Sequence, residues 1–241
     1  MAHACFITGT DTEIGKTTIA AAIVGLLGKT GLRVAGLKPV AAGIGVIDGE
    51  RINEDVHALR AASNVALSAD EIAPFQFETA CAPHVAAALE GRSIDRGRIL
   101  ASIRAAAARC DRVVVEGVGG FRVPFDAAGG WDSADLARDL DLPVLMVVGL
   151  RLGAINHALL TAEAVRVRGL RLCGWVANTI DPAMAQASAT LDALAAGLGN
   201  APCLGLVPRL PAPSPEAVAP YLNVPALHRL FDSDSILKET P

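Results

Sequence analysis

The chain is poor in aromatic and charged residues, and it has no run of basic residues. Of its 241 residues, 4% are aromatic and 19% are charged, and the formal net charge is −4. Clustered lysine and arginine side chains bind nucleic acids and acidic membranes, so neither partner is expected. The longest apolar runs, such as residues 142–150, are too short to span a bilayer.

The cysteines have neither the number nor the spacing of a disulfide framework or a zinc site. They are odd in number and scattered without a C-x-x-C pair, at Cys5, Cys81, Cys110, Cys173 and Cys203. We therefore interpret them as reduced, small core residues. The amino terminus lacks the basic segment followed by an apolar stretch that defines a signal peptide. Together these features predict a cytoplasmic protein.

Short apolar runs alternate with alanine- and leucine-rich helical patterns along the chain. Strands are predicted at residues 4–8, 33–37, 112–115, 144–148, 173–177 and 203–207. Helices are predicted at residues 16–29, 55–62, 85–89, 98–108, 133–140, 157–168 and 183–196. Several strands are apolar on both faces, which is typical of buried parallel strands. This order predicts an α/β fold, with a mostly parallel sheet covered by helices on both faces, in one domain over residues 1–241.

Three segments do not fit the alternation. Residues 41–49 are rich in glycine, and we expect them to be mobile. Residues 208–220 are rich in proline and alanine, and they predict a loop across the surface. The last ten residues are polar, and we expect them to fray.

A glycine-containing loop follows the first predicted strand and leads into the first predicted helix. Its sequence is Gly9-Thr10-Asp11-Thr12-Glu13-Ile14-Gly15-Lys16-Thr17-Thr18. Free backbone N–H groups and a helix N-terminus both favour anionic oxygen, which is typical of a phosphate-binding loop. Lys16 can reach the β- and γ-phosphates of a nucleotide, and the Thr17 hydroxyl can ligate Mg²⁺. Five residues separate Gly9 from Gly15, one more than usual, so more polar side chains should face the γ-phosphate.

Charged residues after two other strands could complete such a site. Glu116, followed by Gly117-Val118-Gly119-Gly120, either ligates Mg²⁺ or caps a strand at the surface. Lys38 either points into the same cleft or lies in a solvated loop. An acidic stretch beyond Lys38 could supply a further ligand or form only a solvated face, and spacing does not choose among Asp48, Glu50, Glu54 and Asp55.

Two further positions could recognise parts of a ligand. Asn178 ends a predicted strand, and its side chain can pair with adenine or simply terminate the strand at a turn. The segment Gly153-Ala154-Ile155-Asn156-His157 opens a helix, so its free N–H groups could hold a carboxylate. From the residues alone, an ordinary helix N-terminus is the preferred interpretation of that segment.

Taken together, these motifs resemble the dethiobiotin synthetase family. The matching segments follow the family order up to about residue 210, at residues 8–17, 36–43, 83–84, 115–120, 153–157 and 174–178. The five-residue spacing in the phosphate loop and the Gly-x-Lys-Pro-Val pattern of residues 36–40 are specific features of this family. The resemblance implies a P-loop enzyme that uses ATP and Mg²⁺ to convert 7,8-diaminononanoate and CO₂ into dethiobiotin.

The resemblance also implies roles for individual residues. Lys16, Lys38 and Thr12 would act on the reacting groups, and Thr17, Asp55 and Glu116 would hold Mg²⁺. The nucleotide would contact Glu13, Ile14, Gly15, Lys16, Thr17, Thr18, Asp55, Glu116, Gly117, Val118, Gly119, Asn178, Pro208, Arg209 and Leu210. The diamine would contact Lys38, Ala42 and Pro83. In a homodimer, its tail carboxylate would lie across the interface on Gly153, Ala154, Ile155 and Asn156.

The chain departs from the family pattern at a few positions. Family members often carry serine in place of Ala42 and can carry tryptophan in place of Arg209. A tyrosine sometimes found near the helix after Asn178 is also absent, since Tyr221 is the only tyrosine. These departures concern substrate affinity and nucleotide selectivity, and the phosphate and metal residues are unchanged.

Three alternatives compete with this interpretation. A P-loop ATPase switch usually carries a signature lysine early in the loop, where this chain has Thr10-Asp11-Thr12. An amidoligase of the cobyrinate-synthesis type carries a glutaminase domain, for which this chain is too short. The chain could be a binding module without catalysis if alanine in place of serine at Ala42 has removed the activity. Lys16, Lys38 and Glu116 are all present, which disfavours this alternative.

Overall fold

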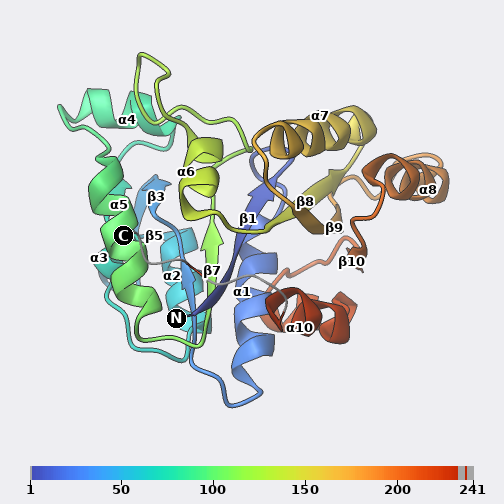
Figure 1. Ribbon diagram of the computed structural model, residues 1–241, viewed down its shortest axis with the longest axis horizontal. Coiled ribbons are helices and arrows are strands. Elements are labelled where there is room, and N and C mark those ends of the chain that lie inside the picture. The colour runs from blue at the N-terminus through green and yellow to red at the C-terminus, as the bar shows by residue number, and fades with distance from the viewer. Residues whose placement is uncertain (1, 233–236, 238–241) are drawn as a thin grey trace.

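Six parallel strands form the central sheet of the protein. The computed structural model describes residues 2–232 and Leu237, and Figure 1 shows their arrangement. The strand order is β10 (Cys203–Val207), β9 (Leu172–Thr179), β8 (Val144–Leu150), β1 (His3–Gly9), β7 (Arg112–Glu116) and β2 (Val34–Leu37), and neighbours pair in parallel. All six predicted strands are confirmed. Every residue of β8 is buried, as its unbroken apolar sequence requires.

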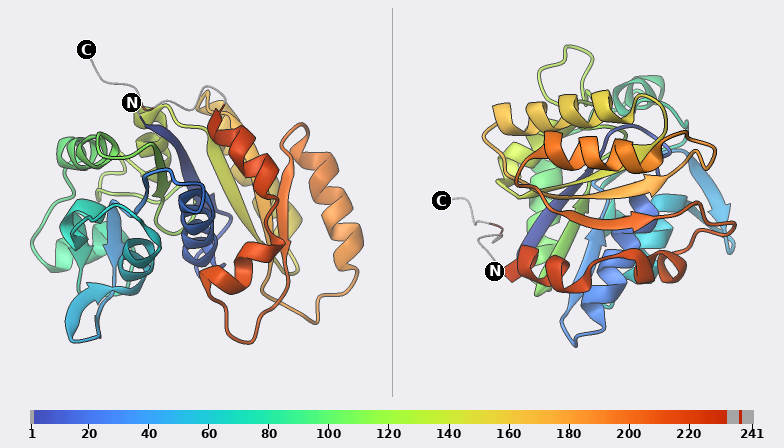
Figure 2. Two further views of the ribbon diagram at one scale, coloured as in Figure 1. Left: turned by 90° about the horizontal axis from the view of Figure 1, so that it is seen from below. Right: turned by 90° about the vertical axis from the view of Figure 1, so that its right-hand side faces the viewer.

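Helices cover both faces of this sheet, which confirms the predicted fold class. Apolar residues of one face pack with α5 (Arg96–Ala107), α6 (Ser133–Leu140), α7 (Ala154–Val167) and α8 (Ala187–Leu198). The other face packs with α1 (Lys16–Gly28), α9 (Pro215–Val218) and α10 (Val224–Asp232). The right view of Figure 2 shows these two layers with the strands between them. The carboxyl ends of the parallel strands meet at one edge, where ligands of such sheets bind.

A small subassembly lies beside β2 and departs from the sequence prediction. Strands β3 (Val40–Ala42) and β6 (Phe75–Phe77) pair in parallel, while β4 (Ile44–Ile47) and β5 (Glu50–Asn53) form a hairpin. Residues 41–49, expected to be a mobile glycine-rich segment, therefore belong to strands and a tight turn. The turn uses Asp48 and Gly49, both with positive φ, a pair that favours two-residue hairpins.

Three short helices complete this part of the chain. They are α2 (Glu54–Ala62), α3 (Ala69–Ile72) and α4 (Pro83–Leu89). The helices α2 and α4 were predicted, with their starts placed one and two residues too late. Helix α3 was missed because it has only four residues, although Ser68 and Glu71 form a capping box around it.

The proline-rich segment 208–220 is only partly a loop. Its last part forms α9 and continues into the 3₁₀ helix η1 (Ala219–Tyr221). Ser214 accepts a hydrogen bond from the Ala217 N–H and Pro215 occupies the first turn, so the local sequence starts a helix there. The predicted fraying of the last ten residues falls almost wholly outside the described residues.

The five cysteines are all free thiols. Cys5, Cys110 and Cys173 are buried, as expected for small core residues, but Cys81 is half-buried and Cys203 is exposed. Cys203 begins β10, an edge strand, so the expectation of a core position was wrong there. Within residues 2–232, no helix combines the length and apolar character needed to cross a membrane.

Candidate functional site

A cavity of about 700 Å³ opens where the phosphate loop meets the carboxyl ends of β2 and β7. Most of the predicted site residues share it, although they come from distant parts of the chain. Those lining it are Thr12, Glu13, Ile14, Gly15, Lys16, Thr17, Thr18, Lys38, Ala42, Asp55, Pro83, Glu116, Val118 and Gly119. Gly117 lies behind this wall, and its N–H donates to the Ile7 carbonyl at 2.9 Å.

The phosphate loop has the tight geometry that its glycines predict. Gly15 is the N-cap of α1 with φ 81°, a left-handed conformation that glycine adopts without strain. A Cβ at this position would lie 2.5 Å from Asn178 Nδ2. The buried Lys16 curls back over the loop, and its Nζ donates to the Asp11 carbonyl at 3.0 Å. The loop therefore holds Lys16 above the first N–H groups of α1, where anionic oxygen is favoured.

Lys38 lies between two carboxylates at the floor of the cavity. Its Nζ is 2.7 Å from Asp55 Oδ2 and 2.7 Å from Glu116 Oε1. Thr17 Oγ1 is 2.7 Å from Asp55 Oδ1 and 2.8 Å from Glu116 Oε1, and its single proton can be donated to either. Glu116 is fully buried and Lys38 is 3% exposed, so solvent screens this cluster only weakly.

The two lysines of the cavity differ in how firmly they hold their protons. Burial lowers the pKa of Lys16 to about 8, and the nearby Lys38 ammonium acts in the same direction. Burial also acts to lower the pKa of Lys38, but Glu116 and Asp55 outweigh it, and the net pKa is raised. Lys38 therefore keeps its positive charge throughout the neutral range.

The two carboxylates are shifted in opposite directions. Burial raises the pKa of Glu116, and Lys38 opposes the shift without cancelling it. Burial acts on Asp55 in the same direction, but Lys38 and Thr17 reverse it, and the pKa of Asp55 is lowered. Asp55 is thus the firmer anion of the pair, which is consistent with its partly exposed side chain.

Oxygen atoms of Thr17, Asp55 and Glu116 could hold a magnesium ion. Glu116 Oε2 is buried and has no hydrogen-bond partner among the described residues, so one strong acceptor remains for a cation. Hard oxygen donors in small number suit Mg²⁺, which keeps several of its waters. Within the described ranges no group of three or more His, Cys, Asp or Glu side chains gathers as a metal site. Two carboxylates and a hydroxyl are therefore the oxygen donors that this cluster offers to the ion.

An adjoining cavity of about 170 Å³ contains the remaining predicted nucleotide residues. Asn178, Pro208, Arg209 and Leu210 line it together with Glu13, Gly15 and Thr18. Its walls also include apolar side chains that sequence reasoning missed, Ile19, Ile180, Val207, Pro213 and Val218. Asn178 Nδ2 donates to the Ile14 carbonyl at 2.8 Å, so this residue also ties β9 to the phosphate loop. The small apolar slot beside the loop has the character of a site for a flat ring.

The far wall of the main cavity includes residues that the sequence did not identify. They are Gly43, Asn53, Ala80, Cys81, Ala82 and Val123. Asn53 could have been found, because asparagine before an acidic first turn is a typical N-cap signal. The others carry no motif, and only the packing of β3, β6 and the loop after β7 brings them to the cavity.

The predicted tail-binding segment, Gly153–Asn156, lies in neither cavity. Gly153 is the N-cap of α7 with φ 92°, and the neighbouring Leu152 is 92% exposed. Arg151 forms an ion pair with Asp11, which connects the start of α7 to the phosphate loop. Within one chain, this segment is therefore attached to the site's rim without contributing to its lining.

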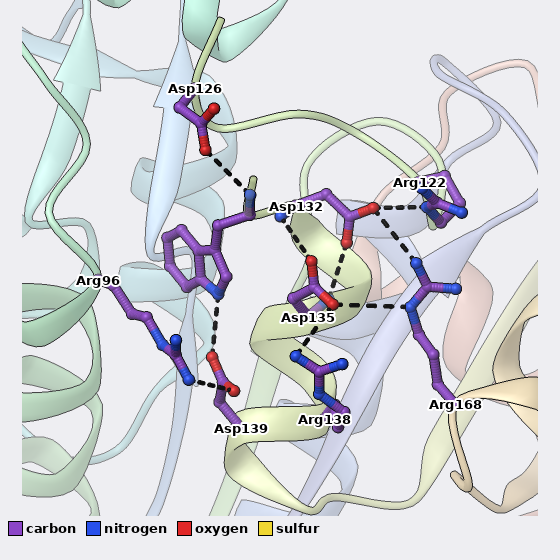
Figure 3. Close-up of polar contacts among 9 residues, drawn as sticks. Arg96, Arg122, Asp126, Asp132, Asp135, Arg138, Asp139 and Arg168 are labelled. Atoms are coloured by element: carbon purple, nitrogen blue, oxygen red, sulfur yellow. Dashed lines mark hydrogen bonds and ion pairs between the residues drawn. The ribbon is translucent and has the colours of Figure 1, made fainter. Parts of the chain in front are cut away.

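The loop that joins Glu116 to α6 is anchored by charged side chains, drawn in Figure 3. The buried Asp132 caps α6 by accepting a hydrogen bond from the Asp135 N–H at 2.8 Å. Its other carboxylate oxygen accepts from Arg122 within the loop and from Arg168 at the end of α7. Asp126 accepts from the Trp131 N–H at 2.9 Å, which closes the loop on itself. These contacts hold the stretch that carries Val118, Gly119 and Val123 to the cavity wall.

We expect Asp132→Ala to lower the free energy of unfolding by about 2–3 kcal/mol, because it removes the cap of α6 and the carboxylate that pairs with Arg122 and Arg168. Arg168 then keeps its longer ion pair with Asp135 and its position over the Phe121 ring. Equilibrium unfolding in urea measures this loss. Asp95→Ala is the matched control, because Asp95 caps α5 through the Arg98 N–H in an exposed position. It should cost only about 1 kcal/mol. Equal losses in the two variants would show that the ion pairs of Asp132 contribute nothing.

A third cavity, of about 580 Å³, lies at the opposite edge of the sheet. It is lined by residues around the amino ends of β9 and β10, including Arg171 and Pro202. None of the predicted site residues borders it. Because ligands of parallel sheets bind at the carboxyl ends of the strands, we place the functional site at the other edge.

Solved structures with the same fold include a cell division protein complex and a ParA family ATPase. A MinC:MinD cell division protein complex of Aquifex aeolicus matches with a TM-score of 0.58 and 18% identity, over 100% of both chains. A ParA family ATPase of Chlorobium tepidum matches with a TM-score of 0.54 and 15% identity, over 95% of this chain and 97% of the other. At these identities the likeness establishes the fold alone.

Sequence comparison is far more specific. A family model described as an AAA domain matches residues 3–217. The ATP-dependent dethiobiotin synthetase BioD of Aromatoleum aromaticum is 51% identical over 92% of this chain and 98% of its own length. The enzyme of the same name from a Janthinobacterium species is 52% identical over 92% of this chain and 95% of its own length. The resemblance stated from the motifs is thereby confirmed, and the chain belongs to the family of ATP-dependent dethiobiotin synthetases.

Proposed function

We propose that this protein carboxylates 7,8-diaminononanoate with CO₂ and closes the product to dethiobiotin, converting ATP to ADP and phosphate. The observation that carries the proposal is the junction of two cationic side chains, Lys16 and Lys38, with the Thr17, Asp55 and Glu116 oxygens in one cavity. Membership of the dethiobiotin synthetase family supports the choice of substrates.

The reaction proceeds through two intermediates, a carbamate and the mixed anhydride that activates it. One amine of the substrate adds to CO₂ and loses a proton, which gives a carbamate. A carbamate oxygen then attacks the γ-phosphorus of ATP, and ADP leaves, which gives a carbamic–phosphoric anhydride. The second amine attacks the carbonyl carbon and loses a proton, phosphate departs, and the ureido ring closes. Holding both amines in one cavity makes the last step effectively unimolecular.

Two anions must approach each other in the phosphoryl-transfer step, so positive charge is the main requirement. Lys38 has a raised pKa and contacts the carbamate as a permanent cation. Lys16 and the N–H groups of the phosphate loop neutralise charge on the β- and γ-phosphates. Thr12, at the edge of the same cavity, orients the reacting oxygen atoms. No protein nucleophile is required.

Thr17, Asp55 and Glu116 would hold Mg²⁺, and the orphaned Glu116 Oε2 supports this assignment. When bound, the ion supplies positive charge that offsets the developing charge on the transferred phosphoryl group. Glu13, Ile14, Gly15 and Thr18 bind the phosphates with the loop. Val118 and Gly119 border the nucleotide opposite them, and Gly117 supports this stretch from behind the wall. Asn178 recognises adenine, which lies among Pro208, Arg209 and Leu210 in the smaller cavity.

The diamine lies against Ala42 and Pro83, and its tail extends toward a second copy of the chain. In a homodimer, the N-terminus of α7, Gly153–Asn156, binds the tail carboxylate of the substrate in the partner's cavity. Exposed apolar side chains on and before α7 support this face as an interface, namely Leu152, Ile155, Leu159 and Leu160. We place the enzyme in the cytoplasm, and its five free thiols support this location.

The first experiment measures ADP release from purified protein with Mg-ATP and bicarbonate, with and without 7,8-diaminononanoate. Release that depends on the diamine, with dethiobiotin identified by mass spectrometry, supports the proposal. ATP hydrolysis that ignores the diamine would instead favour an ATPase switch. Binding of ATP without any turnover would favour a module that has lost catalysis.

A further inference from the structure

Asn53 is a buried polar residue at the cavity whose contacts reach two of its walls. It ends β5, caps α2 and is 4% exposed. It lines the main cavity between Ala42 and Asp55. No step of the proposed reaction uses it, so its burial and its contacts require a separate explanation.

The carbonyl oxygen of the Asn53 side chain fixes the start of α2. Oδ1 accepts hydrogen bonds from the Asp55 N–H at 3.0 Å and the Val56 N–H at 3.4 Å. Asp55 is the residue that contacts Thr17 and Lys38 at the cavity floor. Because the cap holds the first turn of the helix, it also sets the direction in which the Asp55 carboxylate leaves the backbone.

The amide nitrogen of the same side chain fixes the opposite wall. Nδ2 donates to the Ala42 carbonyl at 3.1 Å and to the Gly43 carbonyl at 2.9 Å. The Gly43 N–H donates to the Phe77 carbonyl at 2.9 Å, and a Cβ on Gly43 would lie 3.0 Å from Ala80 Cβ. The Ala42–Gly43 bend thus cannot move independently of Asn53 and β6.

These contacts also settle which way the amide points. Two backbone N–H donors face Oδ1 and two carbonyl acceptors face Nδ2. The flipped orientation would place oxygen against two carbonyls and nitrogen against two N–H groups, losing all four interactions. Only asparagine has both a donor and an acceptor at this length, since aspartate lacks the donor and serine does not reach both carbonyls.

We propose that Asn53 is a positioning residue that sets the distance between the Asp55 carboxylate and the wall that holds the diamine. This inference rests on the proposed function. Asn53 touches no reacting group. It joins two sides of the cavity, the side that holds the nucleotide and metal and the Ala42–Gly43 side that holds the substrate. This connection keeps the carbamate at the distance from the γ-phosphate that the transfer requires.

Substitutions that keep the cap of α2 but remove the amide donor test the contact of Asn53 with the Ala42 and Gly43 carbonyls alone. Serine is a good N-cap and preserves the start of α2, while it frees the Ala42 and Gly43 carbonyls. We expect N53S to raise the KM for 7,8-diaminononanoate by about 10-fold or more, since small displacements of positioning groups have effects of this size. The Kd of Mg-ATP, measured with a fluorescent nucleotide, should change by less than about threefold. N53A loses both the cap of α2 and the donor to the two carbonyls, so it should raise both the KM for the diamine and the Kd of Mg-ATP.

Asn64 offers a matched control outside the cavity. Its Oδ1 accepts from the Val34 N–H at 2.7 Å and its Nδ2 donates to the Leu32 carbonyl at 2.7 Å. N64S therefore removes the same kind of backbone bridge and should leave both constants at wild-type values. Thermal unfolding is recorded for every variant, and assays are run well below the lowest melting temperature. If N53S does not fold, N53D gives the same test, because its carboxylate keeps the cap and repels both carbonyls.

The outcomes separate this inference from the proposed function. If the wild type shows no diamine-dependent ADP release, the proposed function fails before any variant is compared. If the wild type is active and folded N53S or N53D has a wild-type KM for the diamine, the positioning role is overturned. Equal increases in the KM for the diamine and the Kd of Mg-ATP in N53S would also overturn it, because they indicate a general loss of order. A selective rise in the diamine KM supports it.

Discussion

Lys38→Ala is expected to lower kcat by about 10²- to 10³-fold, the usual cost of removing one donor to a developing negative charge. The Kd of Mg-ATP should change by less than about threefold, because Lys16 and the loop N–H groups are untouched. The physical reason is the position of Lys38 Nζ, 2.7 Å from both Asp55 and Glu116, with a pKa raised by their charges. Single-turnover ADP formation and nucleotide titration measure the two quantities separately.

Removing Lys38 also leaves the buried Glu116 without its cation, so the variant should be less stable by about 3 kcal/mol. Assays must therefore be run well below its melting temperature, and circular dichroism must confirm a folded protein. Lys29→Ala, which alters an exposed lysine at the end of α1, is the control and should behave as wild type. A folded Lys38→Ala protein with normal kcat would remove Lys38 from the chemistry of the carbamate.

Glu116→Gln is expected to raise the Mg²⁺ concentration for half-maximal activity by at least about 10- to 100-fold. Losses of this size are typical even for partners of metal ligands, and Glu116 is proposed as a ligand itself. Glutamine has the same shape, so the cavity is preserved while the buried anion is lost. The substitution removes one of the two carboxylates that pair with the buried Lys38, while Asp55 still pairs with it, so thermal unfolding must confirm that the variant is folded.

Titration of ADP release with MgCl₂ at saturating ATP measures this effect. Glu50→Gln is the control, since Glu50 belongs to the acidic stretch after Lys38 but pairs with Arg60 on the surface. Its Mg²⁺ dependence should equal that of the wild type. Identical Mg²⁺ curves for Glu116→Gln and the wild type would eliminate Glu116 as a ligand.

The main sheet could be predicted because strands that are buried on both faces consist almost entirely of apolar residues. Each of the six strands is a short, nearly unbroken apolar run between helical patterns, and each was found within one to two residues at either end. The strands β3 to β6 have only three or four residues and mixed burial, so no periodicity identifies them. The Asp48-Gly49 turn was the one local signal of the hairpin, and the surrounding glycines obscured it.

The same difference explains which site residues could be predicted. Lys16 and Thr17 follow from the phosphate loop alone, and Glu116 follows from its place at the end of a strand. The choice of Asp55 from the acidic stretch needed either the resemblance or the structure, in which Asp55 contacts Thr17 and Lys38. The position of Asp55 depends on where the β4–β5 hairpin places the start of α2, which is a property of the folded chain. Asn53 carries a local N-cap signal, but its bridge to the Ala42 and Gly43 carbonyls is likewise a property of the folded chain.

The position of β1 also governs when the site can form during synthesis. β1 is made first, yet it pairs only with β7 and β8, and their residues lie more than a hundred positions further along the chain. As the chain leaves the ribosome, β1 therefore has two unpaired edges until β7 has emerged, and one of them stays unpaired until β8, which ends at Leu150, has emerged. The phosphate loop at its end cannot hold a nucleotide before then, so ATP can bind and stabilise the enzyme only late in translation. A chain arrested before β8 should have its complete phosphate-loop sequence and no affinity for ATP.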